Sequence, residues 1–163
     1  MDVNEKIVNS WLQNKLFFTI NSIFYGQYHN DIDILAINVK KKEIWDCEVK
    51  VRTGTTMISD NDNKQNGFNH FVNTFQSQER KDKLNEYMDN TFTVKQKFIT
   101  TKSLFGKTDK NQKKWFYKFK QENIEVIYFD EVMNELYEYA IQTKKSTDEI
   151  VQVLRLLQIN NKE

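Results

Sequence analysis

Cysteine is almost absent from this sequence, since Cys47 is the single one among 163 residues. One cysteine excludes an intrachain disulfide and a zinc site built from cysteines. No run of about 18 apolar residues occurs, so no membrane-spanning helix is expected. The first residues carry charge and lack the apolar core of a signal peptide. These absences favour a cytoplasmic protein, because a reducing compartment is where chains without disulfides are common.

Proline is also absent, and there are only 4 glycines. We interpret this scarcity as a compositional bias, because Lys, Asn and Ile are abundant instead. The sequence has no glycine-rich phosphate loop and no nucleophile elbow, so no nucleotide cofactor is expected. Apolar residues make up 39% and charged residues 29%, both near the norms of globular proteins. The length fits one domain over 1–163.

The net charge is +1, which by itself indicates no partner. Its distribution along the chain is uneven, because 91–121 contains nine Lys and one Asp, whereas 122–163 contains nine acids and four bases. A basic middle and an acidic tail could form a polyanion-binding face and a solvated rear. The alternative is a coincidence of exposed helix faces, and composition leaves both open.

Hydrophobic periodicity predicts an α/β fold in which helices flank a mixed β-sheet. A first helix is expected to be capped by Asp2, and a polar turn is expected to join two strands as a hairpin. The predicted helices cover 3–16, 68–88, 111–121, 130–141 and 147–157, the last capped by Ser146 or Thr147. The predicted strands cover 17–25, 31–38, 43–51, 91–101 and 124–129, and a polar loop covers 54–67.

The predicted strand 43–51 has one apolar face and one charged face, because side chains alternate across a strand. Cys47 belongs to the apolar face, so we expect it to pack in the core and not to act as a nucleophile. The charged face carries Asp46, Glu48, Lys50 and Arg52. Exposed strands often carry alternating charged residues, so the alternative is that this face is simply solvated and has no catalytic role.

The partner strand of the hairpin favours a functional reading. It begins with Asp31 and Asp33 and is apolar on both sides beyond Asp33. Such a strand enters the core, so its acids should lie where the sheet meets solvent. If the two strands pair, Asp33 and Glu48 could converge. For Asp31 a solvated strand end is favoured over a second ligand, and for Asp46 a structural role is favoured.

Two carboxylates and an ammonium at such a point suit metal-assisted phosphate chemistry. Mg²⁺ prefers oxygen ligands, often one or two carboxylates with water and substrate phosphate. Asp33 and Glu48 would supply carboxylate oxygens, and the backbone carbonyl of Val49 could supply another. The metal would lower the pKa of a bound water and stabilise charge on the phosphate. Lys50 would orient the attacking water or neutralise the phosphate.

The segments Asn30-Asp-Ile-Asp-Ile-Leu-Ala36 and Cys47-Glu-Val-Lys-Val-Arg52 resemble motifs II and III of the PD-(D/E)xK nucleases. The likeness is closest to archaeal Holliday junction resolvases and small restriction-endonuclease-like proteins. One departure is Ile32, which stands where the motif has proline. The resemblance implies a restriction-endonuclease-like αβββαβ core over about 3–129, with extra C-terminal helices.

The resemblance also implies roles for individual residues. Asp33 and Glu48 would bind metal, Lys50 would be catalytic, and Glu5 is the candidate for an assisting acid on the first helix. The expected activity is Mg²⁺-dependent endonucleolytic cleavage of DNA, of the restriction, junction or repair type, with Mn²⁺ as a substitute for Mg²⁺. A non-catalytic DNA-binding module of the same fold and an RNA nuclease are the alternatives. The C-terminal helices could form a homodimer surface.

Lysines of the basic middle segment are the candidates for nucleic-acid contact. Aromatic residues alternate with the lysines of the predicted helix 111–121 and should mostly be core, so we expect contact with phosphates and not stacking on bases. The candidate residues are Lys95, Lys97, Lys113, Lys114 and Lys118.

Overall fold

The computed structural model describes the chain except residues 1, 29, 55–56, 61–66 and 161–163. Much of the predicted polar loop over 54–67 therefore lies outside the described residues. The helices are α1 (Val3–Asn14), α2 (Phe68–Gln76), α3 (Gln78–Asn85), α4 (Asp109–Gln121), α5 (Phe129–Gln142) and α6 (Glu149–Asn160), with a short 3₁₀ helix η1 (Lys102–Phe105). The strands are β1 (Phe18–Tyr25), β2 (Asn30–Asn38), β3 (Glu43–Lys50), β4 (Thr93–Thr100) and β5 (Ile124–Tyr128).

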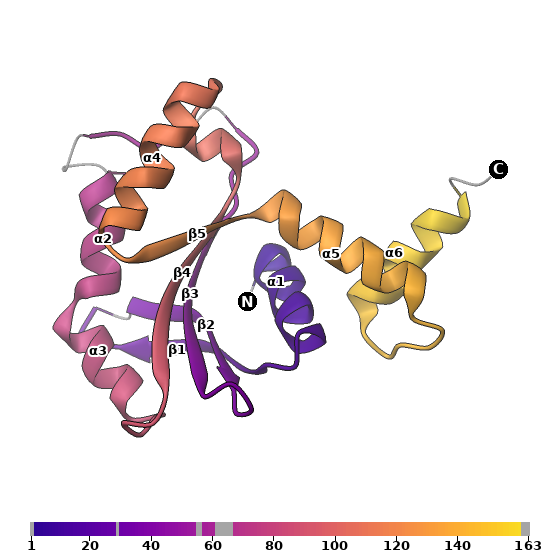
Figure 1. Ribbon diagram of the computed structural model, residues 1–163, viewed down its shortest axis with the longest axis horizontal. Helices are drawn as coiled ribbons and strands as arrows, with labels where there is room; N and C mark the ends of the chain where they lie inside the picture. The colour runs from indigo at the N-terminus through magenta and orange to yellow at the C-terminus, as the bar shows by residue number, and fades with distance from the viewer. Residues whose placement is uncertain (1, 29, 55–56, 61–66, 161–163) are drawn as a thin grey trace.

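The predicted α/β class is confirmed, with one five-stranded mixed sheet between two layers of helices (Figure 1). The strands follow one another across the sheet in the order β1-β2-β3-β4-β5. The first three are antiparallel, so the predicted hairpin of β2 and β3 is confirmed. β3, β4 and β5 are parallel, and the helices that connect parallel strands cover the sheet.

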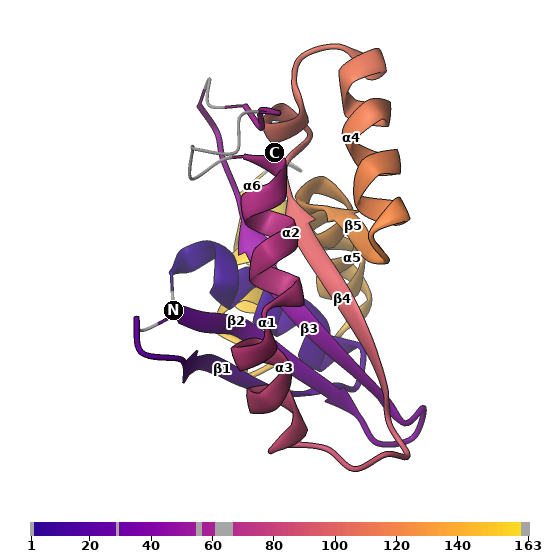
Figure 2. The same ribbon diagram turned by 90° about the vertical axis from the view of Figure 1, so that its left-hand side faces the viewer.

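Each face of the sheet has its own apolar core. Helix α1 covers one face, where Trp11 and Leu12 pack with Ile34 and Cys47, and residues of α5 and α6 extend the same cluster beyond α1. Figure 2 shows α2 and α3 on the other face, with α4 alongside β4 and β5. Aromatic residues dominate the core under α2 and α4, which includes Phe71, Phe75, Phe98, Phe105, Trp115 and Phe119.

Helices α1 and α3 each begin after a residue whose side chain caps the helix, Asp2 and Ser77. The prediction that Asp2 caps α1 is confirmed, because its side chain accepts the Glu5 N–H and the Glu5 side chain accepts the Asp2 N–H. The prediction of one helix over 68–88 is wrong. The chain breaks at Ser77, whose extended backbone ends α2 and whose side chain accepts the Arg80 N–H to begin α3. This break sets the position of α3 over β2 and β3.

The C-terminal helices α5 and α6 form a hairpin that extends away from the sheet (Figure 1). Asp148 caps α6 by accepting the N–H groups of Ile150 and Val151, so the predicted caps Ser146 and Thr147 are corrected. Apolar side chains remain exposed on the hairpin, namely Ile141, Val153, Leu156, Leu157 and Ile159. Within the described residues, no helix combines the length and apolar character that crossing a bilayer requires.

Candidate active site

Asp33 and Glu48 meet where β2 and β3 separate. The ladder between these strands ends at the pair Ile34 and Cys47, so the next pair would be Asp33 and Glu48. Beyond the last pair of the ladder, the Val49 N–H bonds to a side chain of β2 and not to a backbone carbonyl: Oδ2 of Asp33 accepts it at 2.6 Å. The structure thus brings together the two acids that the sequence predicted to converge.

A break in the alternation of β2 turns Asp33 toward β3. Its neighbours Ile32 and Ile34 are both fully buried but pack in different clusters, whereas residues two apart normally share a face. On β1, Ser22 lies opposite Asp33, is left out of the paired register and has a φ of 53°. A non-glycine residue in this region costs about 1 kcal/mol or more and is typical of functional sites. The irregularity turns the Asp33 side chain out of the regular alternation, so that its carboxylate reaches the backbone of β3.

The electrostatics of Asp33 reflect several converging carboxylates. Burial raises the pKa of Asp33 to about 8, and the charges of Glu48, Glu5 and Asp31 add to the rise. The Val49 N–H opposes it. A cation at this point would relieve the repulsion between these groups.

Glu48 has a cationic neighbour that the sequence did not reveal. Burial raises the pKa of Glu48, while the guanidinium of Arg80 opposes the rise. Arg80 lies on α3, its side chain is fully buried, and its Nη1 donates to Oε2 of Glu48 at 3.1 Å. Its other nitrogens donate to Asp46, which is also fully buried. The structural role predicted for Asp46 is therefore confirmed.

Lys50 ends β3 beside these acids. Its charge lowers the pKa of Glu48, so the ammonium lies within electrostatic reach of that carboxylate. Its backbone carbonyl accepts the Thr100 hydroxyl at 2.7 Å, which ties the end of β3 to β4. Among the described residues, Lys50 forms no ion pair. The ammonium can therefore serve an incoming anion.

Glu5 lies in the first turn of α1. Its side chain closes the capping box of α1 by accepting the Asp2 N–H at 3.1 Å. Its charge also raises the pKa of Asp33, but among the described residues Glu5 does not form a metal-holding group with Asp33 and Glu48, so it is not placed as a direct ligand. Asp31 likewise raises the pKa of Asp33 and is half-buried, so the expectation of a solvated strand end holds only in part.

The donor set fits a hard divalent cation that keeps several waters. Within the described residues, the bonds of Asp33 and Glu48 engage Oδ2 and Oε2, which leaves Oδ1 and Oε1. In a strand the N–H and C=O of one residue point to the same neighbour, so the Val49 carbonyl lies on the Asp33 side. In the part of the chain that is described, no group of three or more His, Cys, Asp or Glu side chains could hold a metal. Two carboxylates and a carbonyl, completed by water and substrate, match the usual sphere of Mg²⁺.

The structure separates the five candidate lysines. Lys97 is buried and paired with Glu125, and its ammonium lies 4.2 Å from the centre of the Trp45 ring, so its assignment to nucleic-acid contact is corrected. Lys95 pairs with Glu43 at 2.6 Å.

The other three candidates lie on α4. Lys114 and Lys118 both pair with Asp60, at 2.8 and 2.6 Å, and Lys113 is exposed. The predicted α4 surface therefore exists, but one acid partly neutralises it.

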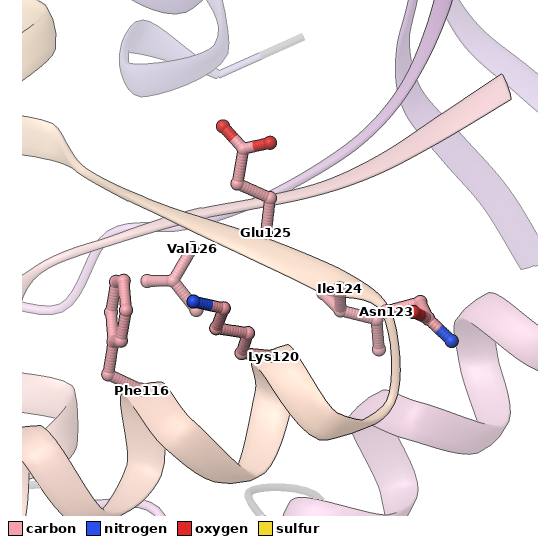
Figure 3. A pocket seen from close by; sticks show the side chains of 6 residues that line it. All are labelled: Phe116, Lys120, Asn123, Ile124, Glu125 and Val126. Carbon is pink, nitrogen blue, oxygen red and sulfur yellow. The ribbon is translucent and has the colours of Figure 1, made fainter. Parts of the chain in front are cut away.

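Two grooves lie apart from these acids. One, of about 470 Å³, runs between α4 and the edge strand β5, with Phe116, Lys120 and Val126 among its lining residues (Figure 3). Glu125 points to the other side of β5 in the same view. The other groove, of about 380 Å³, lies between α1 and α5. Neither is lined by Asp33, Glu48 or Lys50.

Comparisons with known proteins bear on the fold. The sequence matches no protein-family model and no curated protein. Among solved structures, the crystal structure of the protein of unknown function AF1548 matches with a TM-score of 0.55 at 14% identity. The match covers 92% of this chain and 76% of that chain. The two proteins thus share a fold, and their identity is too low to carry an activity from one to the other.

Proposed function

We propose that this protein is a divalent-metal-dependent nuclease of the PD-(D/E)xK type that hydrolyses phosphodiester bonds in DNA. The observation that carries the proposal is the meeting of Asp33 and Glu48 at the end of the β2–β3 ladder, with the Val49 backbone beside Asp33. The order of elements from α1 to β4, with α2 and α3 in the place of one helix, agrees with the restriction-endonuclease-like αβββαβ core that the sequence resemblance implies, and α4 and β5 follow it.

Each residue of the site has a proposed task. Asp33, Glu48 and the Val49 carbonyl would hold Mg²⁺, or Mn²⁺ in its place, since both take oxygen ligands. When bound, the ion would supply Lewis-acid stabilisation of the phosphate and a water of lowered pKa. Lys50 would offset charge on the phosphate, because its ammonium has no ion pair among the described residues. Glu5 would assist from α1 through its effect on Asp33.

DNA is the proposed substrate, cut internally in restriction, junction or repair-type reactions. The α4 lysines supply a cationic surface for phosphates. Cutting both strands of a duplex needs two active sites, so a homodimer is part of the proposal. The exposed apolar side chains of the α5–α6 hairpin are the candidate contact.

A plasmid-nicking assay tests the proposal. Wild-type protein should relax supercoiled plasmid in Mg²⁺ or Mn²⁺ and should leave it intact in EDTA. Asp33→Asn should nick at least about 10²-fold more slowly, whereas Glu131→Gln, an exposed acid on α5, should retain activity. Equal nicking in EDTA, or full activity of Asp33→Asn, would refute the proposed site.

A DNA-binding module of the same fold that does not cut is the second candidate. The observation that favours it is the lack, in the described part of the chain, of three metal-ligating side chains in one group. Such a module would bind DNA equally well in EDTA and would cut neither DNA nor RNA. Parallel assays on a labelled RNA duplex separate the remaining alternative, an RNA nuclease that uses the same residues.

A further inference from the structure

Arg80 is a buried cation that no sequence motif marks. It lies on α3, and its side chain has no exposed surface. Its Nε and Nη2 donate to both oxygens of Asp46, with the closest contact at 2.7 Å. The rings of Phe75 and Tyr25 lie 5.0 and 5.8 Å from the guanidinium carbon. Asp46 and these rings fix the plane of the guanidinium.

The third nitrogen of Arg80 points toward the carboxylate site. Nη1 lies 3.1 Å from Oε2 of Glu48 and 3.5 Å from the backbone carbonyl of Asp31. Arg80 therefore contacts both β2 and β3 just beyond the last pair of their ladder. Nη1 of Arg80 thus bridges β2 and β3 at the point where their backbone pairing ends.

We infer that Arg80 is a positioning residue that holds the Glu48 carboxylate toward Asp33, an inference that rests on the proposed function. A carboxylate on a long side chain can adopt several rotamers, and a bond to one oxygen from a fixed guanidinium selects one of them. Oε2 is engaged in this way, and Oε1 is left for a ligand. The planar fork of arginine can serve Asp46 and Glu48 together, which the single ammonium of lysine cannot do with the same geometry.

A purely structural role for Arg80 makes a different prediction. Replacing a whole buried ion pair with apolar residues of similar size is often tolerated. The double variant Arg80→Met with Asp46→Leu replaces the two fully buried members of the network and leaves Glu48, whose side chain keeps some contact with solvent, so it should keep the fold while it removes the bond that holds Glu48. If Arg80 only compensated the charge of Asp46, this variant would bind metal normally.

The experiment measures Mn²⁺ affinity of the full chain by titration calorimetry, with circular dichroism as the check on folding. Neighbours that orient metal ligands typically contribute about 10- to 100-fold to affinity. We expect a loss of this size in the double variant, and a smaller loss in Arg80→Lys, which keeps the charge without the fork. The matched control replaces the buried Lys97 with Met and its partner Glu125 with Gln, and should bind Mn²⁺ within about twofold of wild type.

The outcomes separate this inference from the proposed function. Wild-type affinity in both the double variant and Arg80→Lys would show that Arg80 does not position Glu48, with the nuclease proposal intact. A wild-type protein that binds no Mn²⁺ would overturn both. Loss of affinity in the Lys97 control as well would assign the effect to general loosening of the sheet and would also overturn the inference.

Discussion

The two faces of β3 come from one strand but have opposite chemistry. On the α1 face, Trp45 packs on Phe17 with ring centres 4.6 Å apart, and Cys47 is fully buried. On the α3 face, Asp46 is fully buried and Glu48 mostly so, with Arg80 as their cation. Apolar burial stabilises the fold, whereas buried acids cost free energy unless they are paired. The apolar face therefore serves stability, and the charged face is where stability and the proposed chemistry compete.

Removing the charged site should produce the largest effect on activity. Asp33→Asn and Glu48→Gln each remove a ligand charge, and Lys50→Ala removes the cation beside them. Each should lower the rate of DNA cleavage by about 10²-fold or more, which is about 2.7 kcal/mol at the barrier. Single-turnover cleavage of a labelled duplex measures this. Unchanged rates in all three variants would show that these residues do not form the active site.

Trp45→Ala tests the opposite face. Trp45 also packs near Trp11, with ring centres 6.1 Å apart, and covers Lys97. Because Trp45 is only half-buried, truncation should lower the free energy of unfolding by about 2 kcal/mol, less than for a fully buried Trp. Urea unfolding measures it. The folded fraction should keep its Mn²⁺ affinity, and a stability equal to wild type would contradict the assignment of this face to the core.

Asp33→Asn should stabilise the metal-free protein, which is the reverse of the Trp45 result. Burial raises the pKa of Asp33 from 3.8 to about 8, so between these values the folded state binds more protons than the unfolded state. The stability of wild type therefore falls as pH rises from about 4 to about 8, and asparagine removes this loss. The gain should be about 1–2 kcal/mol at pH 8 and smaller at pH 5.

Urea unfolding in EDTA at both pH values checks the gain from Asp33→Asn. The substitution need not break the bond to Val49, because the oxygen of a side-chain amide can still accept that N–H. Adding Mg²⁺ should stabilise wild type and leave the variant unchanged, since a ligand stabilises the state that binds it. A variant that is less stable than wild type at pH 8 in EDTA would mean that the Asp33 charge supports the fold.

The sequence predicted the part of the site that depends on a single hairpin. Alternation along 43–51 and the acids of the partner strand were enough to bring Asp33 and Glu48 together, because a hairpin pairs segments that are close in sequence. Arg80 was missed because Gln78–Asn85 is highly charged and reads as a solvated helix. The burial of Asp46, an acid that needs a cation beside it when buried, is the signal for Arg80, and it appears only in the structure.

The burial of Lys97 could not be predicted, because it depends on the order of strands in the sheet. Lys95 and Lys97 fall on one face of the strand, with Val94 and Phe98 on the other, which is typical of a strand with one face in water. β4 instead lies between β3 and β5, and helices cover both faces of the sheet. Periodicity describes one strand, whereas the neighbours of that strand are set by contacts between distant segments.

The lysines of α4 differ from the charges of β3 in that they are largely exposed to solvent. Asp60 pairs with both Lys114 and Lys118, so Asp60→Asn should free two cations and raise affinity for DNA. Replacing Lys113, Lys114 and Lys118 with Gln should flatten the slope of log affinity against log salt by up to about 2–3 units. Fluorescence anisotropy at several salt concentrations measures both. An unchanged slope in the triple variant would show that DNA binds elsewhere.

Substitution of Glu5 should give the smallest effect on Mn²⁺ affinity, because Glu5 influences the site through the effect of its charge on Asp33. The same side chain also bonds at the start of α1. Glu5→Gln keeps the capping box of α1, since glutamine can also accept the Asp2 N–H, but removes the charge that acts on Asp33. Mn²⁺ affinity should fall severalfold while thermal stability and DNA affinity in EDTA stay near wild type. Glu5→Ala also removes the bond from the Asp2 N–H to the Glu5 side chain, while the Asp2 side chain still accepts the backbone N–H of residue 5, so it should lose a little stability in addition. If Glu5→Gln binds Mn²⁺ like wild type and only Glu5→Ala is impaired, Glu5 acts through the helix start alone, and the acids of the site come from β2 and β3.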